Sequence, residues 1–455
     1  MAMWRGVLAA VFWALGGLSP VWALSAEALW RILQDQSAAT GGVLRAGAIE
    51  RAGDVVTLTD VTWVSSSAEA VSEARLARLH LREMVGGEVE LTADPDVTLR
   101  IQLMSEFGAA EPFVLNLRQT GGRILADGVA EDLTLRHDIP DLRLASAQPI
   151  VLGVQGESLR FALQMSDVFG QYRMQLGAMR QIESEIHVGQ LDADFELRVG
   201  AHVMAGRALQ NDIRSVRTGA VPMGLDPSDL AANLAAGLRT DVVMSLGPLV
   251  ATMADGRQFG WQSHALTQRL SRERFDQRAL ITEGFGRIAE KSAVVVTVDE
   301  FAWDVSVPLP KQPIAQEAEI GLRIDGLQLS NAGWNMIDRA MILPRDPIDV
   351  AADLRVGLRW LMDAWLLTPQ DLTSDTVPVV VETVTLNGAR LSAMGAELVA
   401  KGALAALPTD LSGSTAAPTG VVDLTLTGGL TLLDKLAAAG LLAPDQAAGA
   451  KLILG

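Results

Sequence analysis

Residues Val97–Leu103 read VTLRIQL, and this stretch decides the fold class because apolar and polar side chains alternate along it without interruption. Successive side chains of a β-strand point to opposite faces, so the alternation gives the strand one aliphatic and one polar face. Strands with two unlike faces belong to sheets that are solvated on one side, and these sheets are usually antiparallel. The stretch therefore predicts a strand of an antiparallel sheet.

The same two-faced pattern recurs along most of the chain. It is found at Phe113–Arg118, Leu159–Met165, Phe195–Val199, Ile320–Leu329, Leu354–Trp360 and Val422–Leu426. Two continuous β-branched runs, Val294–Val298 and Val377–Val381, predict strands that are covered on both faces. Val71–Met84 fits neither a strand nor a helix period and is left unassigned. We therefore predict a mainly β fold with large, curved antiparallel sheets and a few peripheral α-helices, in a single large domain over residues 24–455.

Helical signals lie between these strands. Ser25 can cap a helix that continues to about Gln36, and Asp226-Pro227 offers an N-cap and a first-turn proline for a helix over Leu230–Leu238. Further helices are predicted at Gly333–Ile342, Gly429–Ala439 and Pro444–Leu452. The segment Ala406–Gly420 is rich in Pro, Ser, Thr and Gly, which predicts a loop between strands.

The first 23 residues have the pattern of a secretory signal peptide. Arg5 is their only charge, an apolar run covers Val7–Leu18, and the segment ends at Ala23, a small residue of the kind that precedes cleavage. The alternative is an uncleaved anchor, but this run is shorter than the ~20 residues that span a bilayer. We expect a periplasmic protein without a transmembrane segment after cleavage, in part because a secreted chain of this size without cysteine fits that compartment.

Composition excludes several classes of function. The 37 Lys and Arg residues against 54 Asp and Glu give a net charge of −17, which opposes electrostatic binding of nucleic acid. The chain has no cysteine, and no hydrolase elbow, metalloprotease helix or phosphate-binding loop occurs. Its histidines are scattered singly, at His80, His137, His187, His202 and His264. We therefore predict a non-enzymatic protein with no catalytic residue, metal site or cofactor.

Many strands with one aliphatic face need a cover for that face, and the predicted helices are too few to supply it. Either two sheets pack together, or a sheet curls into a groove whose aliphatic lining is covered by an apolar ligand. The residues that would contact such a ligand are Leu99, Ile101, Leu103, Leu115, Leu117, Phe161 and Leu163. Two functions stay open: a carrier of lipid or acyl chains, and a scaffold of the cell envelope that binds other envelope proteins and no small ligand.

Several short segments, most of them in the C-terminal third, resemble those of a known family. They are LPRDP at 343–347, LSAMGAEL at 391–398, LDKLA at 433–437 and LLAPDQA at 441–447, together with SAE at 25–27 and VTLT at 56–59. In their order along the chain, these segments resemble the alphaproteobacterial secreted family called domain of unknown function 2125, with AsmA-like envelope proteins as distant relatives. The resemblance implies a periplasmic β-rich protein with a role in envelope lipid handling, and it supplies no catalytic residues. Members of that family usually continue into a final pair of strands beyond the position of Gly455.

Overall fold

The structure, a computed structural model, describes residues 24–39, 41–66, 70–105, 108–109, 111–152, 157–223, 229–288, 294–367, 378–405 and 419–454. The predicted signal peptide, the Asp226-Pro227 cap and most of the predicted loop 406–420 lie outside these residues. Strands make up 67% of the structure and helices 13%, and the helices are short and peripheral. The predicted mainly β, antiparallel fold is therefore confirmed.

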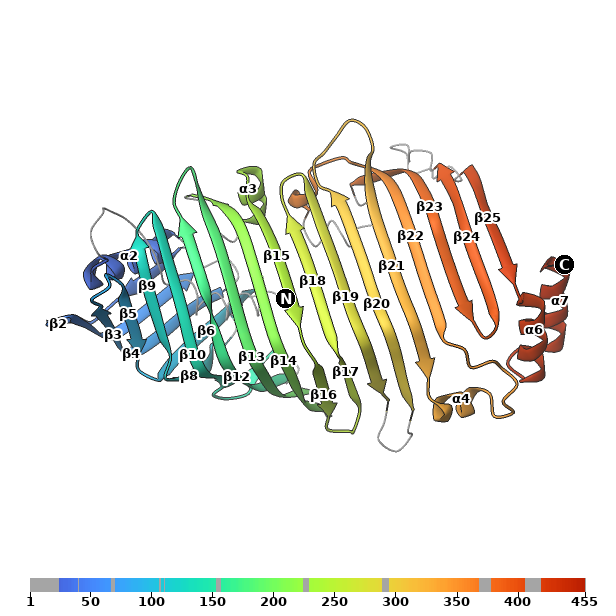
Figure 1. Cartoon of the computed structure of the whole chain (residues 1–455), viewed down its shortest axis with the longest axis horizontal. Helices are drawn as coiled ribbons and strands as arrows, with labels where there is room; N and C mark the ends of the chain where they lie inside the picture. The colour runs from blue at the N-terminus through green and yellow to red at the C-terminus, as the bar shows by residue number, and fades with distance from the viewer. Residues whose placement is uncertain are drawn as a thin grey trace. The chain divides into compact units, whose positions relative to one another are not determined.

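The chain divides into two compact units, residues 1–246 and 247–455 (Figure 1). The described strand pairings of each unit are antiparallel, and most join strands that follow one another along the chain. The single domain over residues 24–455 stays a prediction, and the two units are described separately below as unit 1 and unit 2.

Unit 1 contains two helices and fifteen of the described strands. Its elements are α2 (Ala26–Ala39), β1 (Gly42–Arg45), β2 (Ala48–Ala52), β3 (Val55–Ser66), β4 (Ala70–Glu83), β5 (Val89–Ala93), β6 (Asp96–Ser105), β7 (Gly108–Ala109), β8 (Phe113–Thr120), β9 (Arg123–Val129), β10 (Asp132–Ser146), β11 (Ile150–Val151), β12 (Ser158–Gln175), β13 (Met179–Val199), β14 (His202–Pro222), α3 (Leu230–Ala235) and β15 (Arg239–Leu246).

Unit 2 is also built mainly of antiparallel strands that follow one another along the chain. Its elements are β16 (Leu249–Met253), β17 (Gln258–Trp261), β18 (Ser263–Leu270), β19 (Arg274–Arg287), β20 (Val295–Pro308), β21 (Gln316–Leu329), α4 (Asn331–Ile337), β22 (Ile348–Trp360), the 3₁₀ turn η1 (Ala364–Leu366), β23 (Val379–Ala393), β24 (Ala396–Ala405), β25 (Thr419–Thr427), α6 (Gly429–Ala438) and α7 (Pro444–Leu454).

The main core of unit 1 forms where its sheet curls around α2 (Figure 1). Leu29 of α2 packs in one buried cluster with Leu58 of β3, Leu81 of β4 and Leu133 of β10. The helix presents Ala26, Leu29, Leu33 and their neighbours one turn apart, which is the spacing of a single apolar helix face. The helix thus covers the aliphatic face of the sheet at this end of unit 1.

A line of backbone irregularities, which we call the crease, crosses the sheet of unit 1 at Asp60, Asp167 and Asp212. These residues have φ values of 50°, 53° and 49°, and the strand ladders skip each of them. Each ladder skips one residue on both of its strands there, so the register is kept while the alternation of side chains moves by one position. Leu58 and Val61, three residues apart, are therefore both buried on the same side of β3.

Two helices are shorter than their predicted spans. The helix predicted at Leu230–Leu238 ends at Ala235, and Asp229 caps it by accepting a hydrogen bond from the Ala232 amide at 2.8 Å. The helix predicted at Gly333–Ile342 is α4, which ends at Ile337 because the Asp338 carboxylate accepts a hydrogen bond from the Leu343 amide at 2.7 Å. That bond turns the backbone away from the helix axis.

The two β-branched runs form strands, but they are not covered on both faces. Val294 is buried, whereas Val298 is half-buried and Val381 is 37% exposed. The predicted double cover is therefore wrong for the described residues, since these strands belong to a sheet that has the same two unlike faces throughout. Val377 lies outside the described residues.

Candidate functional site: the aliphatic sheet faces

The seven residues predicted to contact a ligand lie together in unit 1. Strand pairing places Leu99 opposite Leu115 and Leu117 opposite Leu144, so all seven point to the same face of β6, β8 and β12. They form one hydrophobic cluster with Leu142, Leu144 and Ile150. The seven residues therefore share one face of the sheet, as the alternation of the strands predicts.

The residues of this cluster differ in how far they are buried. Leu99, Ile101, Leu115 and Leu117 are buried, whereas Leu103, Phe161 and Leu163 are partly buried and pack against them. Side chains on a curved face shield one another, and contact with a ligand here would require them to part. Their role as ligand contacts stays a prediction.

An open hollow of about 510 Å³ lies beside this cluster, and Phe161 forms part of its wall. Arg143, Arg160, Asp194 and Glu196 also line it. The two basic and two acidic residues balance in charge, so the hollow has no net preference for an anion or a cation.

Unit 2 carries a second aliphatic face. One row across β20–β25 consists of Trp303, Leu322, Ala352, Ala389, Ala400 and Leu424, each paired with the next. A neighbouring row consists of Phe301, Ile324, Val350, Leu391, Leu398 and Leu426. Six strands at ~4.8 Å spacing make each row about 24 Å long.

The aliphatic face of unit 2 is open to solvent in its central strands. Ile320 is 40% exposed, Leu322 38% and Leu391 43%, values that a packed core does not allow. Among the described residues of this unit, α4 packs on β21 and α6 on β24, and Figure 1 shows α4 at the strand ends and α6 beyond β25. Large contiguous apolar patches are uncommon on the surface of soluble proteins, and where they occur they often mark binding sites.

The opposite face of unit 2 is polar and internally paired. Arg323 donates to Asp325 at 2.7 Å, Arg390 lies 2.6 Å from Glu397, and Arg355 pairs with a glutamate of β21. Exposed pairs of this kind contribute only ~0–1 kcal/mol each, so they define a solvated face and add little stability. The two faces of unit 2 therefore differ sharply in character.

A buried arginine stands out on the aliphatic face of unit 1. Arg180 of β13 is only 6% exposed, and its Nε atom is buried without a hydrogen-bond partner. Burial lowers the pKa of this guanidinium, and the half-buried Tyr172 of β12 acts in the opposite direction. Burial raises the pKa of the Tyr172 hydroxyl, which Arg180 and Arg217 act to lower. Tyr172 therefore lies within electrostatic reach of both arginines.

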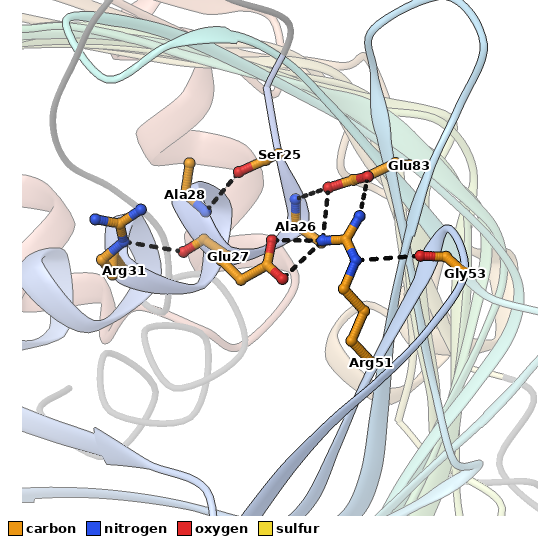
Figure 2. A network of polar contacts seen from close by, with 8 residues as sticks. All are labelled: Ser25, Ala26, Glu27, Ala28, Arg31, Arg51, Gly53 and Glu83. Carbon is orange, nitrogen blue, oxygen red and sulfur yellow. Dashed lines mark hydrogen bonds and ion pairs between the residues drawn. The ribbon is translucent and has the colours of Figure 1, made fainter.

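A charged network fixes the start of α2 (Figure 2). Arg51 donates to Glu27 at 2.7 Å and to Glu83 at 2.5 Å, while Glu83 also accepts a hydrogen bond from the Ala26 amide at 2.9 Å. Hydrogen bonds from Arg51 hold the pKa of both carboxyls below the usual range. The acids are satisfied by the helix and by β2, so the network anchors α2 and leaves no free group for chemistry.

The described residues contain no cluster of three or more His, Asp or Glu side chains that could hold a metal ion. None of the helices that the structure describes combines the length and the apolar character required to cross a membrane. Comparison of the chain with models of protein families, with curated proteins and with solved structures finds no match.

Proposed function

We propose that this chain is a non-enzymatic periplasmic envelope protein that binds or carries the acyl chains of lipids on its aliphatic sheet faces. The observation that carries the proposal is the open face of unit 2, where two rows of apolar side chains cross six paired strands and Leu322, Leu391, Leu424 and Leu426 are exposed. Covering such side chains is favourable by ~25 cal/mol for each Å² of apolar area removed from water. A ligand or partner that covers the face gains this free energy.

The geometry of the face favours a long, unbranched apolar chain. Side chains on one face of a strand repeat every second residue, so adjacent rows lie ~6.6–6.8 Å apart. The row of Leu322 and the row of Leu391 therefore run side by side across the strands, and the Leu322 row includes the small residues Ala352 and Ala389. An extended acyl chain that lies along these rows would contact side chains of several strands at once.

Location and resemblance support the same function. The N-terminal 23 residues have the pattern of a signal peptide, and the C-terminal phrases LPRDP and LSAMGAEL resemble a secreted family grouped with AsmA-like envelope proteins. We propose the bacterial periplasm as the compartment and envelope lipids as the source of the acyl chains.

The test uses a double variant of the open face and a matched control on the opposite face. Leu322→Asp/Leu391→Asp places two carboxylates on the aliphatic face, and we expect binding of a fluorescent fatty acid to weaken by more than about tenfold, since a desolvated carboxylate costs several kcal/mol. Val399 is 40% exposed on the polar face of β24, so Val399→Asp should bind the probe as wild type does. Equal binding by both variants would contradict the proposal.

A scaffold of the cell envelope is the second candidate, and the edge strand β25 favours it. All nine residues of β25 are exposed, including Val421 and Leu424, and β24 is its only partner strand among the described residues. An exposed apolar edge can add a strand from another polypeptide. Native mass spectrometry of the protein from the periplasm separates the two functions: bound lipid near one per chain supports the carrier, and a lipid-free complex with a polypeptide supports the scaffold.

A further inference from the structure

The burial of Arg180 requires an explanation that the fold does not provide. A guanidinium is always charged in proteins, and moving it out of water without a partner is strongly unfavourable. Arg180 is more than nine-tenths buried, its Nε has no partner, and no carboxylate of the described residues contributes to its electrostatics. A buried cation without a counter-charge implies that an anion completes the arrangement.

The surroundings of Arg180 supply the other parts of an anion site. Tyr172 lies opposite Ser184 in the β12–β13 ladder, and Ser184 lies opposite Arg217 in the β13–β14 ladder. Because every second residue of β13 shares a face, Arg180 and Ser184 point to the same side as these two neighbours. Two guanidinium groups and two hydroxyl groups therefore lie on one side of three adjacent strands, and Tyr172 interacts electrostatically with both arginines.

The same face continues into an aliphatic surface. Ile182 and Ile186 of β13 share the face of Arg180, and both are half-buried. An anion held by Arg180 would thus have apolar side chains directly beside it, which is the layout that an amphipathic molecule requires. Arg recognises phosphate and carboxylate by two parallel hydrogen bonds, so either group fits the chemistry.

We infer that Arg180, Tyr172 and Arg217 form a binding site for the phosphate or carboxylate headgroup of an amphipathic lipid. This inference rests on the proposed function, because the acyl chain of that lipid needs an aliphatic sheet face. It adds a selectivity that an aliphatic face alone does not provide: lipids with an anionic head bind in preference to neutral ones.

The experiment compares dodecyl phosphate, dodecyl maltoside and inorganic phosphate, with the two detergents kept below the concentration at which they form micelles. Wild type should bind dodecyl phosphate at least about tenfold more tightly than dodecyl maltoside, as charge-assisted hydrogen bonds imply. Arg180→Met should lose this preference and still bind dodecyl maltoside. Arg217 is exposed, so Arg217→Met keeps the fold and should reduce the preference by a smaller factor.

The control is Arg160→Met, an exposed arginine on the opposite face of β12, which should leave all three affinities unchanged. Equal affinity of wild type for the two detergents would overturn the headgroup site and leave acyl binding intact, whereas no binding of either would overturn the proposed function itself. Inorganic phosphate that binds as tightly as dodecyl phosphate, and no longer binds Arg180→Met, would show that free phosphate is the anion and would overturn the lipid assignment.

Discussion

Unit 1 and unit 2 are built from the same kind of strand but treat their aliphatic faces differently. In unit 1 the sheet curls around α2, and Leu29, Leu58 and Leu81 are all fully buried. In unit 2 the equivalent face stays open, and Leu322 and Leu391 keep 38% and 43% of their surface exposed. The comparison teaches that alternation fixes which side chains share a face, whereas a separate element decides whether that face becomes a core or stays exposed to solvent.

The largest effect is expected from the same substitution placed on each face. Leu115 of unit 1 is 1% exposed, so Leu115→Asp buries an unpaired carboxylate and should cost several kcal/mol of unfolding free energy. Leu322→Asp leaves its carboxylate in water and should cost less than ~1 kcal/mol. Urea unfolding followed by circular dichroism measures both values, and equal losses would break the comparison.

Shortening an apolar side chain, without adding a charge, should also cost more unfolding free energy in unit 1 than in unit 2. Leu29→Ala removes a fully buried side chain from the contact between α2 and the sheet, and we expect a loss of ~2–5 kcal/mol. Leu391→Ala removes a side chain that is already half in water, so its loss should stay below ~1 kcal/mol. Thermal unfolding reports the difference. A large loss for Leu391→Ala would mean that another part of the protein covers unit 2.

A third pair of variants concerns a backbone feature that both units contain, a non-glycine residue with positive φ inside a strand. Asp167 in unit 1 and Glu283 in unit 2 both have positive φ, at 53° and 49°, and both sit where a ladder skips a residue. A β-branched residue is strained there, so Asp167→Val and Glu283→Val should each cost ~1–3 kcal/mol. The glycine variants are the controls and should be close to neutral. Unequal costs would show that the irregularity matters in one unit alone.

The smallest effect is the pH dependence of the α2 anchor. Arg51 lowers the pKa of Glu27 and Glu83 in the folded state below their ordinary value of 4.5. The anchor therefore contributes its full stability above about pH 4.5 and loses it as the pH falls through the lowered pKa values. Arg51→Met should melt at a lower temperature than wild type at pH 7, and the gap should close in acid. A gap that widens in acid would contradict this sign.

Much of the architecture could be predicted because alternation is a local signal. Val97–Leu103 became β6, and Ser25 caps α2 through a hydrogen bond from the Ala28 amide at 3.1 Å. Val71–Met84 could not be assigned because β4 crosses the crease, where its ladder with β3 skips a residue between Leu76 and Leu79. One strand thus carries two alternations out of phase, and neither covers the whole segment.

The candidate site was only partly accessible from the sequence. The seven predicted residues share a face because the strand register agrees with the alternation. Leu115 is buried and Leu322 is exposed, and this difference depends on elements far away in the sequence, which alternation does not predict. Arg180 gave no signal in the sequence, since an arginine after a turn normally faces water. Its burial follows from the face it occupies on β13, which the strand pairing reveals.

The crease has a consequence for how this protein can change length in evolution. Deleting Asp167 alone would give β12 one continuous alternation. The aliphatic residues of the strand segment before or after the deletion would then move to the polar face of the sheet. The partner strands β10 and β13 would keep their own skipped residues, Pro140 and Gly189, and the ladders would no longer match. Single-residue deletions should therefore be tolerated in the hairpin turns and rejected at the crease. Related chains would be expected to gain or lose crease residues in several strands together.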